Sequence, residues 1–457
     1  DAPPPPPSAA AAPSAPAFTQ LYTINDGVVV VSSAEQLRAA LLDDGVRAVR
    51  LVEHVVLPRW PPPSRSEVPR GPPGGEVPDS VTRLDPAEDG DPAPDTSHSE
   101  LPSIGATGAG ADADGARRRR LLQTSKDYLV WQFKGNLDRL KSSTSFVINS
   151  TKRVFGACGE APEGRCKVEG NGAARLFVLL SAPNVTFENL ELTGGASQAG
   201  GAVFVDWMSP GVAFRACSFV ANSAVEYSTV ENNLPATSNS VVAAGAVFVN
   251  GTEGVVFDNV VFEGNMATLG MHEAGYSAWS RVYGGAVTLL GASGVVFSNV
   301  TFTSNAATTA AGDVLGGAVY MAGCEDVNMV DVRFVDNAAR GTLDDDVAAS
   351  GGAVALVQVA RIVFDGCTWQ GNEAVPGERA DGQGGAVAVF RGHTTTLVRC
   401  DFSNNGVTGS RLSSPSGGAV YATSTLALAV TASLFSNNRA RDTLSLASIE
   451  NVDGEGG

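Results

Sequence analysis

Two short motifs recur together between residues 200 and 438. The first is Gly-Gly-Ala-Val, once varied to Ala-Gly-Ala-Val, and its copies begin at Gly200, Ala244, Gly284, Gly316, Gly351, Gly384 and Gly417. The second is an aromatic residue with asparagine three positions later, at Phe219/Asn222, Phe262/Asn265, Phe302/Asn305, Phe334/Asn337, Trp369/Asn372, Phe402/Asn405 and Phe435/Asn438. It follows the first motif by 18 residues in six copies and by 19 in one. Two motifs at a fixed offset indicate a stack of similar units.

The aligned copies alternate in the way that β-strands do. The fourth residue of the glycine motif is always valine, as in Val319, Val354 and Val387, and the residue two further on is always apolar. A second apolar pair, such as Val295 and Phe297, precedes the aromatic residue, which itself points inward from a third strand. We therefore expect an all-β fold, a right-handed parallel β-helix of about eight or more three-sided coils. The repeated valines should then lie above one another in one interior file.

Two other columns should join neighbouring coils. Asparagines at one corner are expected to form a hydrogen-bonded ladder along the axis, and glycines at another corner admit positive φ. Four cysteines fall in the coils and are expected to be buried as small apolar side chains: Cys217, Cys324, Cys367 and Cys400. Cys158 and Cys166 lie in a Gly-rich loop, where they would form a disulfide in an oxidising compartment and stay reduced elsewhere.

The paired motifs resemble those of the polymorphic outer-membrane-protein repeat family. In that family a Gly-Gly-Ala-Ile-like motif and Phe-x-x-Asn lie within a pectin-lyase-like β-helix. The resemblance covers residues 176–438, and residues 158–195 are similar to the first coils of right-handed β-helix proteins. It implies an adhesin, an autotransporter passenger or a wall-associated surface protein, in which the motifs are structural and supply no catalytic residue.

Composition divides the whole chain into five segments. These are a disordered Pro/Ala-rich tail (1–18), a strand-helix-strand cap (19–57), a disordered Pro/Gly/acidic insertion (58–126), the first β-helix coils (127–199) and the repeats (200–457). In the cap, Ser32 and Glu35 have capping-box spacing for a helix over 34–42. We expect this helix to cover one end of the β-helix, because open strand edges recruit other chains.

Charge and hydropathy exclude several classes of partner. The net charge of −17 disfavours nucleic acid and anionic membrane surfaces. No apolar run approaches 18 residues, so we expect no transmembrane segment. An export signal would have to precede Asp1, and the predicted location is extracellular, at the cell surface or in the cell wall.

Polysaccharide-processing enzymes are the main alternative, since the same fold carries pectate lyases and polygalacturonases. Such enzymes need paired carboxylates, or Ca²⁺-binding acids with a base. The densest acidic group, Asp344–Asp346, lies in a variable connector, and the four histidines lack metal-ligand spacing: His54, His98, His272 and His393. The sequence therefore predicts no catalytic residue, no cofactor and no metal site.

The connectors after the ladder asparagines are the predicted recognition surface. The first two are the longest and carry Tyr227, Met271, His272, Tyr276, Trp279 and Tyr283. These side chains either bind a protein or glycan partner or pack the loops onto the rod. Possible N-glycosylation sequons begin at Asn149, Asn184, Asn250 and Asn299. Arg117–Arg120 is either a processing site or a solvated charge cluster, and the chain could also be one segment of a larger surface protein.

Overall fold

The computed structural model describes residues 24–25, 27–57, 145–159, 164–172, 174–225, 241–269, 280–310, 312–341, 347–409 and 413–442. The predicted tail 1–18 and insertion 58–126 lie outside these residues, as does Arg117–Arg120. The described residues contain one helix, α1 (Ala34–Leu42), and strands that build five sheets, which we name A to E.

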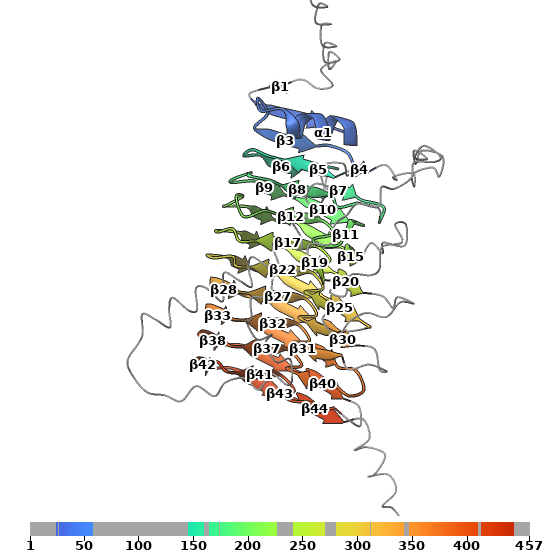
Figure 1. The fold of residues 1–457 in the computed structure, drawn as a ribbon. Helices are drawn as coiled ribbons and strands as arrows, with labels where there is room; N and C mark the ends of the chain where they lie inside the picture. The colour runs from blue at the N-terminus through green and yellow to red at the C-terminus, as the bar shows by residue number, and fades with distance from the viewer. Residues whose placement is uncertain are drawn as a thin grey trace, which may run out of the picture. The chain divides into compact units, whose positions relative to one another are not determined.

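Three sheets run through most of the stack (Figure 1). Sheet A contains β1 (Ile24–Asn25), β2 (Val28–Val31), β3 (Ala48–Leu51), β6 (Arg153–Gly156), β9 (Thr186–Glu188), β13 (Ala213–Arg215), β18 (Val256–Asp258), β23 (Val296–Ser298), β28 (Glu325–Val330), β33 (Ala360–Asp365), β38 (Thr394–Val398) and β42 (Ala427–Thr431). Sheet B contains β4 (Val55–Val56), β7 (Cys166–Glu169), β10 (Leu190–Thr193), β14 (Ser218–Val220), β19 (Val261–Glu263), β24 (Thr301–Thr303), β29 (Arg333–Val335), β34 (Thr368–Gln370), β39 (Asp401–Ser403) and β43 (Leu434–Ser436). Sheet C contains β5 (Phe146–Ile148), β8 (Phe177–Leu179), β12 (Val203–Val205), β17 (Val247–Asn250), β22 (Val287–Leu290), β27 (Val319–Ala322), β32 (Val354–Val357), β37 (Val387–Phe390) and β41 (Val420–Thr423).

Two further sheets are built from the connectors. Sheet D contains β11 (Ala196–Ser197), β15 (Ser223–Val225), β20 (Met266–Leu269), β25 (Ala306–Thr309), β30 (Ala338–Gly341), β35 (Glu373–Val375), β40 (Gly406–Gly409) and β44 (Arg439–Asp442). Sheet E contains β16 (Val241–Ala243), β21 (Arg281–Tyr283), β26 (Asp313–Leu315), β31 (Ala348–Ser350) and β36 (Gly382–Gln383). A full coil therefore has five strands, two more than the repeat motifs predict.

The register places equivalent residues of successive coils opposite one another. Val319 pairs with Val354, and Val354 pairs with Val387, so the predicted interior file of valines is confirmed. The named strands pair in parallel except β1, which is antiparallel to β2. Each coil thus repeats the side-chain environment of the one before it.

Sheets A, B and C enclose the main core. Its largest side chains form stacks along the axis, with ring centroids 4.7 Å apart for Phe262 and Phe302 and 4.3 Å apart for Trp369 and Phe402. Offset stacking of this kind adds to the apolar area that each ring buries. The predicted inward position of the aromatic residue is confirmed.

A second, smaller core lies between sheets D and E. It consists of small side chains such as Ala267, Ala307 and Val314. Sheet E also packs against the outer face of sheet C, where Phe204 and Phe248 are buried. The outward side chains of sheet C are consequently covered along much of the stack, which the repeat motifs do not reveal.

The asparagines form the predicted ladder. Nδ2 of each donates to Oδ1 of the next, at 2.9–3.0 Å from Asn222 to Asn438. The same Nδ2 group also donates to a main-chain carbonyl of the preceding coil, as from Asn337 to Phe302 at 2.9 Å. In the interior of the stack, both the oxygen and the nitrogen of each side-chain amide have hydrogen-bond partners. Burial of the amide therefore leaves no polar atom of it unsatisfied.

The two glycines of the motif have different roles. Gly316 has φ +74°, a conformation that L side chains rarely adopt. A Cβ on its neighbour Gly317 would lie 2.0 Å from the carbonyl oxygen of Gly352 in the next coil. The first glycine turns the chain, and the second lets neighbouring backbones approach.

The helix α1 covers the N-terminal end of the stack (Figure 1), where it contacts β5 and its Leu37 and Leu41 are buried in the main core. Its N-cap is Ser33, whose side chain accepts from the main-chain N of Gln36 at 3.3 Å. The predicted capping pair Ser32/Glu35 is therefore wrong by one residue, and the pair at the start of the helix is Ser33/Gln36. The side chain of Gln36 also holds the chain that enters the helix, because its Oε1 accepts from the main-chain N of Ser32 at 2.8 Å.

A buried lysine holds the other end of α1. Nζ of Lys152 donates to the carbonyl oxygens of Asp43 and Val46, at 2.8 and 2.6 Å. Carbonyls at a helix C-terminus lack partners within the helix, and a cation placed there interacts favourably with the negative end of the helix dipole. Burial lowers the pKa of Lys152, and the carboxylates of Asp44 and Asp43 oppose this.

Candidate functional site

The connector loops leave the stack at one edge, between sheets D and E. Strands of sheet D pair in parallel register with one another, and so do the strands of sheet E. The loops 226–240, 270–279 and 342–346 each join a strand of D to one of E. Loops from successive coils therefore emerge at neighbouring positions along the edge, as the connector lengths suggested.

The predicted contact residues divide into two groups. Five lie outside the described residues: Tyr227, Met271, His272, Tyr276 and Trp279. The sixth, Tyr283, is only 4% exposed and stacks on Tyr320 with centroids 4.3 Å apart. Its assignment to the recognition surface is wrong, because β21 turns this ring toward the outer face of sheet C, where burial raises the pKa of Tyr283.

A charged pair lies beside the loop exits. Nε of Arg281 is 3.3 Å from Oδ2 of Asp313, one coil further along sheet E. Burial raises the pKa of Asp313, and Arg281 opposes this shift. The adjacent Tyr283 is the main cause of a raised pKa at Arg281. This ion pair and the stacked rings of Tyr283 and Tyr320 lie on strands next to the ends of the loops.

A second surface, missed in the sequence, lies on the turn between β12 and β13. Trp207 is 61% exposed and Met208 is 44% exposed. Beneath them, Oδ1 of the buried Asp206 accepts from the main-chain N of Met208 at 2.5 Å, and burial raises the pKa of Asp206. An exposed indole on an ordered turn is suited to stack on a sugar ring or an apolar side chain. No periodic signal marks Trp207, since turns between sheets C and A vary freely.

The remaining chemistry-bearing side chains are scattered. His54 accepts from the main-chain N of Lys167 at 2.9 Å, and His393 lies 2.9 Å from the hydroxyl of Thr394 on an exposed turn. His98 and Asp344–Asp346 lie outside the described residues. Within the part of the chain that the structure describes, no three His, Cys, Asp or Glu side chains are grouped as metal ligands.

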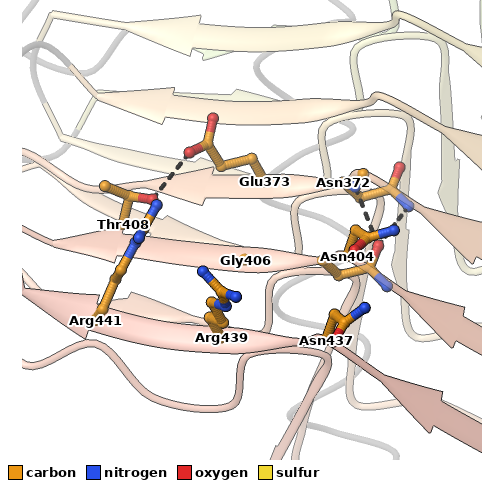
Figure 2. A pocket seen from close by; sticks show the side chains of 10 residues that line it. Asn372, Glu373, Asn404, Gly406, Thr408, Asn437, Arg439 and Arg441 are labelled. Atoms are coloured by element: carbon orange, nitrogen blue, oxygen red, sulfur yellow. Dashed lines mark hydrogen bonds between the residues drawn. The ribbon is translucent and has the colours of Figure 1, made fainter.

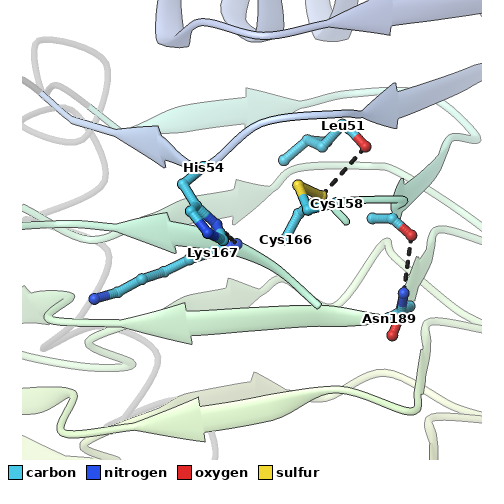
Figure 3. Close-up of a disulfide and its surroundings, with 7 residues drawn as sticks. Leu51, His54, Cys158, Cys166, Lys167 and Asn189 are labelled. Atoms are coloured by element: carbon cyan, nitrogen blue, oxygen red, sulfur yellow. Dashed lines mark hydrogen bonds between the residues drawn. A yellow bond between two sulfur atoms is a disulfide. The ribbon is translucent and has the colours of Figure 1, made fainter. Parts of the chain in front are cut away.

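Cys158 and Cys166 are joined by a disulfide near the N-terminal end (Figure 3), with Cα atoms 5.1 Å apart. The bond links the end of β6 to the start of β7, and the carbonyl oxygen of Leu51 lies 3.2 Å from the sulfur of Cys166. Next to it, Nδ2 of Asn189 donates to the carbonyl of Gly156 at 2.9 Å. The bridge therefore fixes a corner of the first coils beside the cap.

The other four cysteines are free and buried, as predicted. Burial raises the pKa of Cys217 to about 12. A hydrogen bond with Cys400 and burial both raise the pKa of Cys367. All four thiols are buried side chains of the core.

The four sequons differ in accessibility. Asn149, Asn184 and Asn299 have exposed side chains. Asn250 is only 7% exposed, because it follows the inward strand residue Val249 and lies against the next coil. The prediction of Asn250 as a glycosylation acceptor is therefore wrong, because its side chain is buried.

A shallow groove crosses the outer side of sheet D near the C-terminal end of the stack (Figure 2). Glu373, Thr408, Arg439 and Arg441 line it, and the Thr408 hydroxyl donates to Oε1 of Glu373 at 2.9 Å. Its floor is formed by the Asn corner of the last coils. The groove has a volume of about 430 Å³ and presents two guanidinium groups on one strand.

Comparison with known proteins agrees with this geometry. Residues 285–451 match a family model described as "Right handed beta helix region". The fold is a right-handed parallel β-helix. No curated protein and no solved structure matches the chain. Among the described residues of this β-helix, no helix has the length and apolar character needed to cross a membrane.

Proposed function

We propose that the protein is a non-enzymatic extracellular or cell-surface scaffold, adhesive in function, that presents loops from one edge of the β-helix. The observation that carries this proposal is the shared exit of the connectors between sheets D and E. The polymorphic outer-membrane-protein repeat resemblance belongs to the same proposal. A protein or glycan is the proposed partner class, because binding residues are common on connectors that a rigid scaffold positions.

The connectors differ in length from coil to coil while the stacked strands keep the same register, which favours a role in presenting loops. The interior columns and the Asn ladder, which are built from described residues of the strands and corners, hold the register. The loop 226–240 and the short connector 376–381 follow equivalent strands, β15 and β35, without disturbing the ladder. Recognition residues can therefore change while the rod stays intact.

The disulfide and the sequons support an extracellular location. Disulfides persist in oxidising compartments, and Cys158 is bonded to Cys166. Exposed acceptors at Asn149, Asn184 and Asn299 are compatible with secretion through a glycosylating pathway. Mass spectrometry of the native protein, alkylated before digestion, tests this: a linked Cys158–Cys166 peptide is expected, and two alkylated cysteines there contradict an oxidising compartment.

A glycan and cell-binding panel tests the adhesive function. The full chain is compared with a variant in which 270–280 is replaced by the sequence of 376–381, and with Trp207→Ala. We expect retention on a glycan or cell without bond cleavage, reduced at least about tenfold by the loop replacement, as for loss of a binding hot spot. Arg333→Gln, an exposed change on sheet B away from the loop edge, is the control and should leave retention unchanged. Release of shortened glycans would instead support the polysaccharide-processing alternative.

A further inference from the structure

An exposed apolar pair lies on the turn 206–212, which joins β12 to β13. Trp207 is 61% exposed and Met208 is 44% exposed. The main chain of this turn is fixed, because N of Ser209 donates to the carbonyl of Asp206 at 3.1 Å and Oδ1 of Asp206 accepts from N of Met208. The indole and the thioether are therefore held at the surface by an ordered turn.

The turn of the preceding coil, residues 180–185 between β8 and β9, packs against this pair. The main-chain N of Asn184 donates to the carbonyl of Pro210 at 2.7 Å. Oγ of Ser181 donates to Sδ of Met208 at 3.8 Å. The two turns thus form one ordered surface across neighbouring coils.

The side chain of Asn184 lies over the turn that carries Trp207. A Cβ at Gly211, in that turn, would lie 2.5 Å from Oδ1 of Asn184. The glycine therefore makes room for this amide. Asn184 is exposed and begins the sequon Asn184-Val185-Thr186. A sugar bonded to its Nδ2 would start over the turn 206–212, beside the exposed pair.

An attached sugar is a suitable cover for this pair. The C–H groups on one face of a hexopyranose pack against the negative face of an indole, and an N-acetyl methyl group packs against a thioether. This contact removes apolar area from water. A tethered sugar also has a high effective concentration at the turn, so weak stacking suffices to hold it, which is not the case for a free ligand.

We propose that Asn184 carries an N-linked glycan whose first residue, an N-acetylhexosamine, stacks on Trp207 and covers Met208. The inference rests on the extracellular location proposed above, because N-glycans are transferred to exported chains. In the transfer, the anomeric carbon of a polyprenyl-diphosphate-linked oligosaccharide forms a bond to Nδ2 of Asn184. Its bond to the diphosphate oxygen breaks, the polyprenyl diphosphate leaves, and Nδ2 releases one proton to solvent.

Glycopeptide mass spectrometry and indole oxidation test the two parts of the proposal. In the full chain secreted from a glycosylating host, we expect a glycan on Asn184. N-bromosuccinimide then oxidises exposed indoles, and the rate at Trp207 is measured from its peptide. Because a stacked sugar covers one face of the ring, oxidation should be at least about twofold slower than in Thr186→Val, which loses the sequon but keeps Asn184.

Thr301→Val is the matched control. It removes the sequon of Asn299, and Thr301 is the half-buried first residue of β24 as Thr186 is of β9. Asn299 lies at the corner between sheets A and B, so the loss of a glycan there should leave the oxidation rate of Trp207 unchanged.

Enzymatic trimming tests the contact without a substitution. An endoglycosidase that leaves one N-acetylglucosamine on Asn184 should preserve the protection of Trp207. An amidase that releases the whole glycan should remove this protection.

Three outcomes would overturn the inference. One is a glycan on Asn184 with Trp207 oxidised as fast as in Thr186→Val, which would leave the indole open to another partner. A second is an unmodified Asn184 in a chain glycosylated at Asn149 or Asn299. The third is a chain without any glycan, in which case the Cys158–Cys166 linkage decides separately whether the extracellular location stands.

Discussion

Nδ2 of Asn305 donates a hydrogen bond to Oδ1 of Asn337 at 3.0 Å, and the main-chain N of Asn305 donates to the same oxygen, also at 3.0 Å. The two residues are 32 positions apart and belong to successive coils. One side-chain oxygen therefore satisfies two buried donors of its neighbour. The stability of each coil depends on the next one through this contact.

Replacing one rung should have a large effect. Asn337→Ala leaves the two donors of Asn305 unsatisfied, together with the carbonyl of Phe302. We expect a loss of about 2–4 kcal/mol in the free energy of unfolding, measured by urea denaturation, since buried orphaned groups cost about 1–3 kcal/mol each. The exposed Asn328→Ala on β28, which has ordinary strand φ, is the control, with a change below about 0.5 kcal/mol. Equal effects of both changes would contradict the structural role of the ladder.

Two glycines should respond very differently to alanine. A Cβ at Gly317 would meet the Gly352 oxygen at 2.0 Å and main-chain atoms of Ala338 at 2.4 and 2.6 Å. Gly264 has φ +60° but open space around a Cβ. We expect Gly264→Ala to cost about 1–2 kcal/mol for its backbone conformation, and Gly317→Ala to abolish cooperative folding of the neighbouring coils. Circular dichroism during thermal unfolding compares them.

The stacked indole should tolerate phenylalanine but not alanine. Trp369 is fully buried between Phe334 and Phe402, and its Nε1 has no hydrogen-bond partner among the described residues. Trp369→Ala should cost about 3–5 kcal/mol. Trp369→Phe loses apolar contacts but also removes an unsatisfied donor, so its change should stay within about 1.5 kcal/mol. A larger loss in chemical denaturation would show that the column requires the indole.

The disulfide should stabilise the N-terminal coils. Replacement of both Cys158 and Cys166 by alanine opens a loop with a sequence separation of 8, and chain entropy predicts a cost of about 2–3 kcal/mol. Hydrogen exchange should localise the added opening to β6 and β7. If wild type and variant unfold alike without reductant, the bond contributes nothing to stability.

The buried thiols should make stability fall at alkaline pH. Burial raises the pKa of Cys217 from 9.0 to about 12, so its contribution to folding is complete below pH 9 and is lost as the pH rises from 9 toward 12. The urea midpoint of the wild type should therefore drop more between pH 8 and 10 than that of Cys217→Ala. A thiol reagent should label no native cysteine at pH 8 and four after unfolding without reductant.

The main core was predictable because its signal is local and periodic. The file of Val319, Val354 and Val387 and the ladder position of Asn337 both follow from residues that recur at fixed offsets. Inward side chains of stacked coils face the same neighbours in every repeat. The same residue type therefore suits each position in every repeat, and alignment of the repeats with one another reveals the column.

Sheets D and E escaped prediction although weak columns mark them. Alanine or valine stands two positions after each ladder asparagine, as in Ala307 and Ala339, and apolar residues stand two before several of the glycine motifs, as in Val282 and Val314. Variable loops between these columns conceal their period. The position of Tyr283 depends on Tyr320 in the next coil, a contact without a repeating counterpart, so no sequence pattern distinguishes it from a loop residue.

Because every ladder bond from Asn222 to Asn438 runs in the same sense, the β-helix is modular in length. Removal of residues 316–350 would bring Asn305 directly before Asn372, with the same donors and acceptors in place, and would set Val287 against Val354. Whole coils can thus be gained or lost in evolution by duplication or deletion of one repeat, without any compensating change elsewhere in the frame. The distance between the N-terminal cap and the C-terminal groove would then change in steps of one strand spacing, about 4.8 Å.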